Sequence, residues 1–132
     1  MIFHRKRNVY VNKAQPSRNL NIPDDPIGTF AGDVDLTLVK DLETSIKPHS
    51  NLAFTSPQPH PAWDDADFKG RLAFIVTTED RAVPKDAQYG MMAASQQEWI
   101  VKEMACSHCG PFLNRIEETV GVLQDVIGRF SA

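Results

Sequence analysis

The chain has 132 residues, of which 42% are hydrophobic and 23% are charged. This composition is typical of a single globular domain and argues against disorder along most of its length. The net charge of −3 excludes a general electrostatic attraction to nucleic acid. No apolar run reaches the roughly 18 residues that a spanning helix needs, so we expect neither nucleic acid nor a membrane among the partners.

Residues 1–30 are predicted to form a basic N-terminal arm and linker. The first 18 residues carry five basic side chains and no acidic one, which favours a solvated tail over a nucleic-acid or membrane-surface patch. Asn8–Val11 fits a short strand, and the prolines that follow it predict a loop. The start lacks the apolar core of a secretory signal, so we expect a cytoplasmic protein. The basic residues are Arg5, Lys6, Arg7, Lys13 and Arg18.

The next section, residues 31–68, combines a helix with a long loop. Asp33 is placed as an N-cap, and the apolar residues from Val34 to Ile46 recur at helical spacing until Pro48, which disfavours continuing the helix. The sequence therefore predicts an amphipathic helix of about three to four turns. The four prolines from Pro48 to Pro61, both included, then predict a packed irregular loop.

Two features of this half invite a functional interpretation. Gly28–Gly32 has the glycine spacing of a nucleophile elbow, but Phe30 stands where the serine should be, so we predict a turn. His49 and His60 have side chains of the kind that bind metal ions or carry protons. Nothing at ligand spacing surrounds them, so loop packing is the favoured interpretation, and no cofactor or resident metal is expected.

Residues 69–132 have the clearest pattern. Leu72–Val76 is a continuous apolar run, typical of a parallel strand covered on both faces. A loop to Pro84 precedes a predicted helix at Lys85–Ser95, and Glu98–Met104 predicts a second strand. The order strand, helix, strand, helix implies a parallel sheet with a right-handed crossover. A final amphipathic helix carries the apolar stripe Leu113, Ile116, Val120, Leu123, Ile127 and Phe130.

Asp80 and His108 follow the two predicted strands. The carboxyl ends of parallel strands meet at one edge of a sheet, so short loops there bring a carboxylate onto an imidazole N–H. Such a contact fixes the tautomer of the histidine and stabilises the imidazolium that forms when it takes a proton. The sequence therefore predicts Asp80 and His108 as candidate catalytic residues. The alternative is a turn aspartate and a polar loop histidine.

The same residues carry a family resemblance. Thr78–Pro84 and the loop from His108 to Phe112 are similar to the triad acid and triad histidine loops of the α/β-hydrolase superfamily. The likeness is to the methylesterase and hydroxynitrile-lyase-like branch and its fungal relatives. Lys47–Ser50 and Ala53–Pro57 also resemble the end of the cap region in fungal members, so the resemblance covers about residues 31–132.

The resemblance implies a fold class and a function. The fold would be α/β, the C-terminal part of an α/β-hydrolase fold, with two parallel strands and flanking helices after a helical cap-like segment at 31–68, and with an incomplete sheet. Asp80 would be the orienting acid and His108 the general base of an ester hydrolase, or of related small-molecule acyl or lyase chemistry. The substrate would be a small ester or a related compound.

The nucleophile that this chemistry requires is missing from the resemblance. The G-x-S-x-G elbow and the oxyanion loop are absent, and no upstream serine lies in an elbow context. An Asp–His pair without them retains little of the acceleration of a complete triad. A truncated or inactive protein, or a non-catalytic remnant that binds small molecules, is therefore an alternative. The upstream serines are Ser17, Ser45, Ser50 and Ser56.

A rival chemistry lies in the loop that carries His108, residues 105–111, which we call the histidine loop. Cys106 and Cys109 form a C-x-x-C between a predicted strand and a predicted helix, the setting in which dithiol redox proteins lower a thiol pKa. The chain after Cys109 is too short for the further strands of such folds. Two incidental thiols are the alternative.

The predicted sheet also suggests a partner. The Leu72–Val76 strand reads as a strand with neighbours on both sides, yet only one neighbour is predicted. Either Asn8–Val11 pairs with it, or the chain self-associates or binds a partner chain that covers the open edge.

Overall fold

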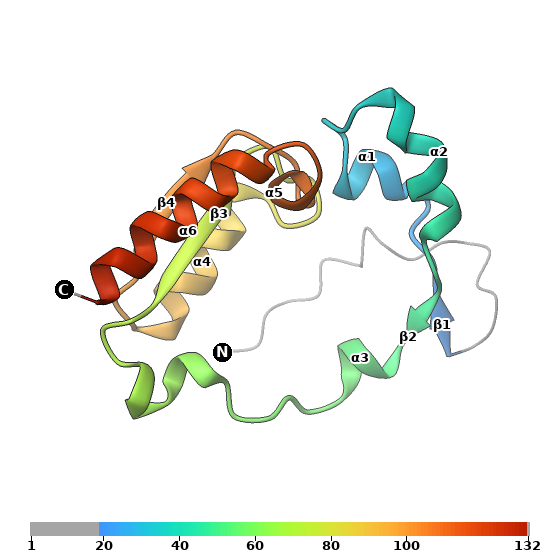
Figure 1. Cartoon of the computed structure of the whole chain (residues 1–132). Coiled ribbons are helices and arrows are strands. Elements are labelled where there is room, and N and C mark those ends of the chain that lie inside the picture. The colour runs from blue at the N-terminus through green and yellow to red at the C-terminus, as the bar shows by residue number, and fades with distance from the viewer. Residues whose placement is uncertain (1–18, 132) are drawn as a thin grey trace.

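The computed structural model describes residues 19–131. The predicted Asn8–Val11 strand and the five basic residues of the predicted arm lie outside the described residues. The described chain is mixed α/β, with a small parallel two-stranded sheet and flanking helices (Figure 1). This agrees with the predicted α/β class. None of its helices is long and apolar enough to cross a membrane.

The N-terminal part holds short elements. Strands β1 (Leu20–Asn21) and β2 (His49–Ser50) pair antiparallel, and between them lie helices α1 (Pro26–Phe30) and α2 (Leu36–Ser45). The loop that follows contains α3 (Leu52–Thr55) and two 3₁₀ turns, η1 (Ala62–Asp64) and η2 (Ala66–Phe68). It leads along one side of the molecule to the parallel sheet (Figure 1).

Helix α1 corrects the prediction of a turn at Gly28–Gly32. Asp25 caps this helix by accepting a hydrogen bond from the Gly28 N–H at 2.9 Å, and Pro26 occupies the first helical position. An acidic N-cap followed by proline is a recognised helix start, so the signal was present in the sequence.

The start of α2 is also different from the prediction. Asp35, not Asp33, is its N-cap, because the Asp35 carboxylate accepts the Thr37 N–H at 2.8 Å. Asp33 instead accepts a hydrogen bond from the Ser107 N–H at 3.1 Å. A tertiary contact thus takes the residue that the local pattern had assigned to the helix.

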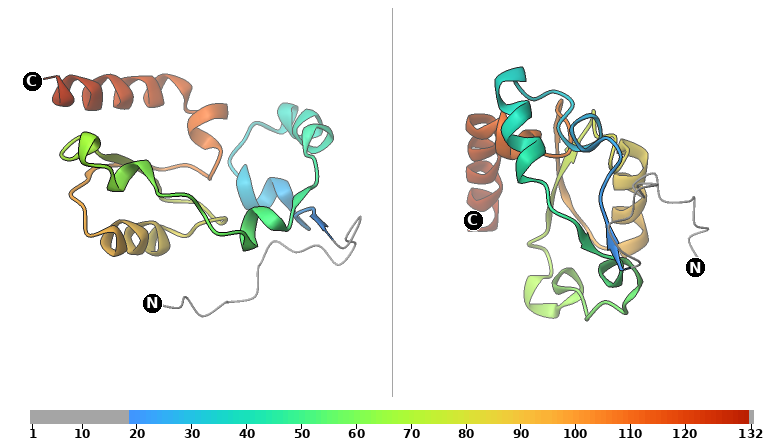
Figure 2. Two further views of the ribbon diagram at one scale, coloured as in Figure 1. Left: turned by 90° about the horizontal axis from the view of Figure 1, so that it is seen from below. Right: turned by 90° about the vertical axis from the view of Figure 1, so that its right-hand side faces the viewer.

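The parallel sheet consists of β3 (Ala73–Thr77) and β4 (Ile100–Met104), joined by helix α4 (Lys85–Ser95). The helix has the predicted bounds, and both strands lie within one or two residues of prediction. Short helix α5 (Gly110–Leu113) and the long α6 (Ile116–Phe130) follow. Helices α4 and α6 cover opposite faces of the sheet (Figure 2). The most deeply buried large side chains are Val76, Met104 and Cys106.

Helix α6 does not bury its predicted apolar stripe. Its buried residues are Thr119 and Val126, whereas most of the stripe faces solvent. Four members of the stripe have 46% to 60% of their surface exposed: Ile116, Val120, Leu123 and Ile127. The pattern correctly predicted a helix from Ile116 onward, whereas Leu113 belongs to the separate short helix α5. The described chain contains no element that covers the exposed side of α6.

Candidate active site

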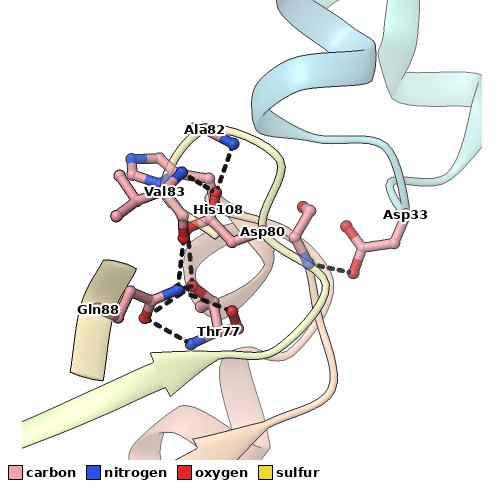
Figure 3. Close-up of polar contacts among 8 residues, drawn as sticks. Asp33, Thr77, Asp80, Ala82, Val83, Gln88 and His108 are labelled. Atoms are coloured by element: carbon pink, nitrogen blue, oxygen red, sulfur yellow. Dashed lines mark hydrogen bonds and ion pairs between the residues drawn. The ribbon is translucent and has the colours of Figure 1, made fainter. Parts of the chain in front are cut away.

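Asp80 lies in the loop after β3, where the chain folds around its carboxylate. The Oδ1 atom accepts the backbone N–H groups of Ala82 at 2.7 Å and Val83 at 2.8 Å (Figure 3). The Oδ2 atom accepts the hydroxyl of Thr77 at 2.9 Å. The side chain is only 2% exposed, so these donors replace the water that the carboxylate loses on burial.

His108 meets this carboxylate from the loop after β4. Its Nδ1 atom lies 2.8 Å from Asp80 Oδ2, so the structure brings together the two residues that the sequence placed at neighbouring strand ends. The Asp80 oxygens act as acceptors throughout, and this assigns the shared hydrogen to Nδ1 and leaves Nε2 as the basic nitrogen. The imidazole is 41% exposed, and the ring of Phe30 lies edge-on to it with centroids 5.5 Å apart.

Gln88 on α4 is a site residue that the sequence interpretation missed. Its Nε2 atom donates to the backbone oxygens of Thr77 at 2.9 Å and Val83 at 2.8 Å, and its Oε1 atom accepts the Thr77 N–H at 3.1 Å (Figure 3). Gln88 therefore ties Thr77, where β3 ends and the Asp80 loop begins, to Val83 near the other end of that loop. Gln88 is 3% exposed. A polar residue four positions before the buried Met92 on one helix is the only sequence signal for it.

The histidine loop is fixed to the N-terminal part by three hydrogen bonds. The Asn114 side-chain amide donates to the Asp33 backbone oxygen at 2.8 Å, and the Cys109 N–H donates to the Phe30 oxygen at 2.7 Å. The third joins the Ser107 N–H to the Asp33 carboxylate. Burial raises the pKa of Asp33, but hydrogen bonding of its carboxylate, chiefly with Ser107, outweighs burial and holds the pKa below its ordinary value.

A cavity of about 510 Å³ opens between the two parts of the chain and has His108 in its wall. Among the described residues its lining is almost entirely apolar, and Lys47 is the one permanently charged side chain in it. The apolar side chains include Phe30, Ile46, Phe54 and Val83. A cavity of this size and character suits a small molecule with an apolar body. A second cavity of about 370 Å³ lies along β3 and also reaches Asp80 and His108.

Serine hydroxyls do not complete a triad in the part of the chain described. Ser45 Oγ donates to the Leu42 oxygen, and Ser50 Oγ accepts the Leu52 N–H, so both act on their own local turns. Ser17 lies outside the described residues. Across residues 19–131, no hydroxyl or thiol forms a hydrogen bond with His108 Nε2.

The two thiols have environments unlike those of redox cysteines. Burial, with a contribution from the Asp33 charge, raises the pKa of Cys106 to about 11. Burial and then the charge of Asp80 also raise the pKa of Cys109. Catalytic dithiols have a lowered thiol pKa, which is the opposite direction. Both cysteines are free.

No hydrogen bond, ion pair or ring contact joins His49 or His60 to the Asp80–His108 pair. The ring of His49 packs edge-on against Phe54 with centroids 4.7 Å apart, and His49 contributes to the wall of the larger cavity. His60 lies 3.9 Å from Asp64 on an exposed loop. Between residues 19 and 131, histidine, cysteine and acidic side chains form no group of three or more that could hold a metal ion.

Comparison with known proteins gives no family for this chain: it matches no protein-family model, no curated protein and no solved structure.

Proposed function

We propose that the protein is α/β-hydrolase-like and acts on small esters or related acyl compounds, with His108 as general base and Asp80 as its orienting acid. The observation that carries this proposal is the 2.8 Å contact between His108 Nδ1 and the buried Asp80 carboxylate. A buried, fully hydrogen-bonded carboxylate holds the imidazole in one tautomer and stabilises the imidazolium. The resemblance of residues 31–132 to the C-terminal part of that superfamily supports the same assignment.

In this proposal the apolar cavity holds the acyl or alcohol group, and the reacting carbonyl lies at His108. Nε2 removes a proton from a water molecule as the water oxygen attacks the carbonyl carbon. The imidazolium then returns the proton to the departing alkoxide, and the products are an acid and an alcohol. A water nucleophile is slower than an activated serine, so we expect low turnover.

The test is hydrolysis of aryl esters by the purified chain. We expect a rate above the uncatalysed background that falls at least tenfold in His108→Ala, because this substitution removes the base that Asp80 orients. His60→Ala is the matched control, since His60 is exposed and outside the cavity. Equal rates for the chain and His108→Ala would show that the pair does not catalyse ester hydrolysis.

Binding without turnover is the second candidate function. It is favoured by the cavity itself combined with the lack of a nucleophile bonded to His108 among the described residues. It predicts that aryl esters raise the melting temperature while no hydrolysis occurs. Ile46→Arg, which introduces a charge into the cavity wall, should abolish that shift.

A further inference from the structure

The outer edge of β3 is formed by alternate residues whose backbone groups point away from β4. The Ile100 N–H donates to the Leu72 oxygen, and the Thr78 N–H donates to the Met104 oxygen, both at 2.9 Å. In a parallel ladder every second residue faces the same neighbour. The N–H and C=O groups of Ala73, Ile75 and Thr77 therefore face the opposite edge, where the described chain has no further strand.

Gln88 occupies one of these three positions. Its side-chain amide pairs with both the N–H and the C=O of Thr77, as a residue of a neighbouring strand would. The edge that remains for pairing is therefore short and defined: it consists of Ala73 and Ile75.

The two edges of the sheet have different chemistry. The β4 edge carries Lys102 and Glu103, which form ion pairs with Asp125 at 2.6 Å and with Lys85 at 2.8 Å. Charged residues of this kind protect natural edges from pairing with other chains. Strand β3 has the sequence Ala-Phe-Ile-Val-Thr and no charged residue. The β4 edge therefore has protective charged side chains, and β3 has none.

An apolar surface continues from the β3 edge onto the helices. The cavity of about 370 Å³ along this edge is lined by Phe74 and Ile75 of β3, and by Met91 and Leu123 from the two flanking helices. Leu123 belongs to the exposed stripe of α6, whereas Asp125 on the same helix pairs with β4. The stripe therefore lies on the β3 side of the molecule.

We propose that the β3 edge binds a second copy of this chain, through antiparallel pairing of β3 with β3 about a two-fold axis at Phe74. This register places Ala73 of each copy opposite Ile75 of the other and forms hydrogen bonds with the four backbone groups of Ala73 and Ile75 that point away from β4 on each copy. A register centred on Ile75 would oppose Ala73 to Thr77, whose groups Gln88 already holds. A parallel pair about a two-fold would face like groups with like.

The same axis covers the apolar surface. A two-fold perpendicular to the sheet keeps each helix on its own face, so α6 of one copy lies beside α6 of the other. Their exposed stripes then face each other. Specific interfaces need about 1,000 Å² of buried area or more, and the four half-exposed side chains of the stripe on each copy contribute to it beyond the short strand pair.

The first experiment is the mass of the full chain in solution by light scattering and sedimentation across a range of concentrations. We expect a dimer, and at least tenfold weaker dimerisation in Ile75→Pro, which removes an N–H that faces the open edge rather than β4. Leu123→Lys, on the α6 stripe, should weaken the dimer in the same way. Val101→Pro is the matched control, because the Val101 N–H faces the outer edge of β4.

The second experiment tests the register. Phe74 faces its own copy across the axis as a non-hydrogen-bonded pair, whose Cα atoms lie about 4.5 Å apart, within disulfide range. Phe74→Cys should therefore form an intermolecular disulfide under mild oxidation, and Val101→Cys should not. A monomer at all concentrations, a dimer unaffected by both Ile75→Pro and Leu123→Lys, or equal crosslinking at both positions would overturn the proposal.

Discussion

The side-chain amide of Gln88 pairs with both backbone polar groups of Thr77 and so ends the β3 edge with a side chain. We predict that Gln88→Met destabilises the protein by about 3 kcal/mol. Methionine fills a similar volume but leaves the Thr77 N–H, the Thr77 oxygen and the Val83 oxygen without their partner, and each orphaned group costs roughly 1–3 kcal/mol when it stays buried. Urea unfolding measures the change.

The control for this substitution is Gln124→Met on α6. Gln124 is exposed, so the same chemical change should alter the free energy of unfolding by less than about 0.5 kcal/mol. Similar losses in both variants would contradict a specific role for Gln88.

Asp80→Asn should reverse the tautomer of His108. The asparagine amide replaces one acceptor oxygen with a donor, so Nδ1 of His108 becomes the acceptor and the hydrogen moves to Nε2. Long-range ¹⁵N–¹H correlation spectra at neutral pH distinguish the two tautomers directly. The measurement does not depend on activity, and an unchanged Nδ1–H tautomer in the variant would show that Asp80 does not orient the ring.

The two thiols should react slowly at pH 8. With a pKa of about 11, Cys106 is ionised to only about one part in a thousand at that pH, and its side chain is fully buried. Cys109 is partly exposed, so it should react first with a thiol reagent, and Cys106 should react only on unfolding. Rapid modification of both cysteines in the folded protein would contradict this prediction and support the dithiol redox hypothesis.

Gly110 and Gly121 should respond in opposite ways to alanine. A Cβ at Gly110 would lie 2.5 Å from Cys106 Cβ, so Gly110→Ala should destabilise the protein by roughly 1–3 kcal/mol through overpacking beside the histidine loop. A Cβ at Gly121 meets nothing within 4 Å, and Gly121→Ala should stabilise α6 by roughly 0.5–1 kcal/mol. Thermal unfolding of the two variants checks both signs.

The attachment of the N-terminal part should weaken in acid. The pKa of Asp33 is lower in the folded chain than its ordinary value of 3.8. The stabilisation it supplies is therefore complete above the unfolded value and is lost as the pH falls through the folded one. Asp33→Asn should destabilise the protein at pH 7 and make a smaller difference below pH 3. Urea unfolding at the two values measures this, and a constant difference would contradict it.

Much of the C-terminal half was predictable because its signals are local. The apolar run ending at Val76 and the proline at Pro84 mark a strand and a helix start without reference to the rest of the chain. Once two parallel strands are assigned, geometry alone brings Asp80 to His108. The structure shows this contact, while the catalytic role of the pair stays a prediction.

Other features depended on distant partners and could not be read in this way. Asp33 and Asp35 are equally good N-caps by type, and only the tertiary bond from Ser107 decides between them. Gln88 resembles any polar helix residue until the end of β3 is placed against it. The periodicity of α6 predicts an apolar face but not what covers it, and most of the predicted stripe, including Leu123, is exposed.

The crossover between β3 and β4 also determines when this site can form during folding. Ala73 pairs with Ile100, so the chain must close a loop through all of α4 before the first ladder hydrogen bond can form. Helix α4 depends on local contacts and can form early, but the imidazole reaches its carboxylate only after the strands are in register. The His108 tautomer is therefore a late reporter, and its NMR signal should appear with the slowest refolding phase of the sheet.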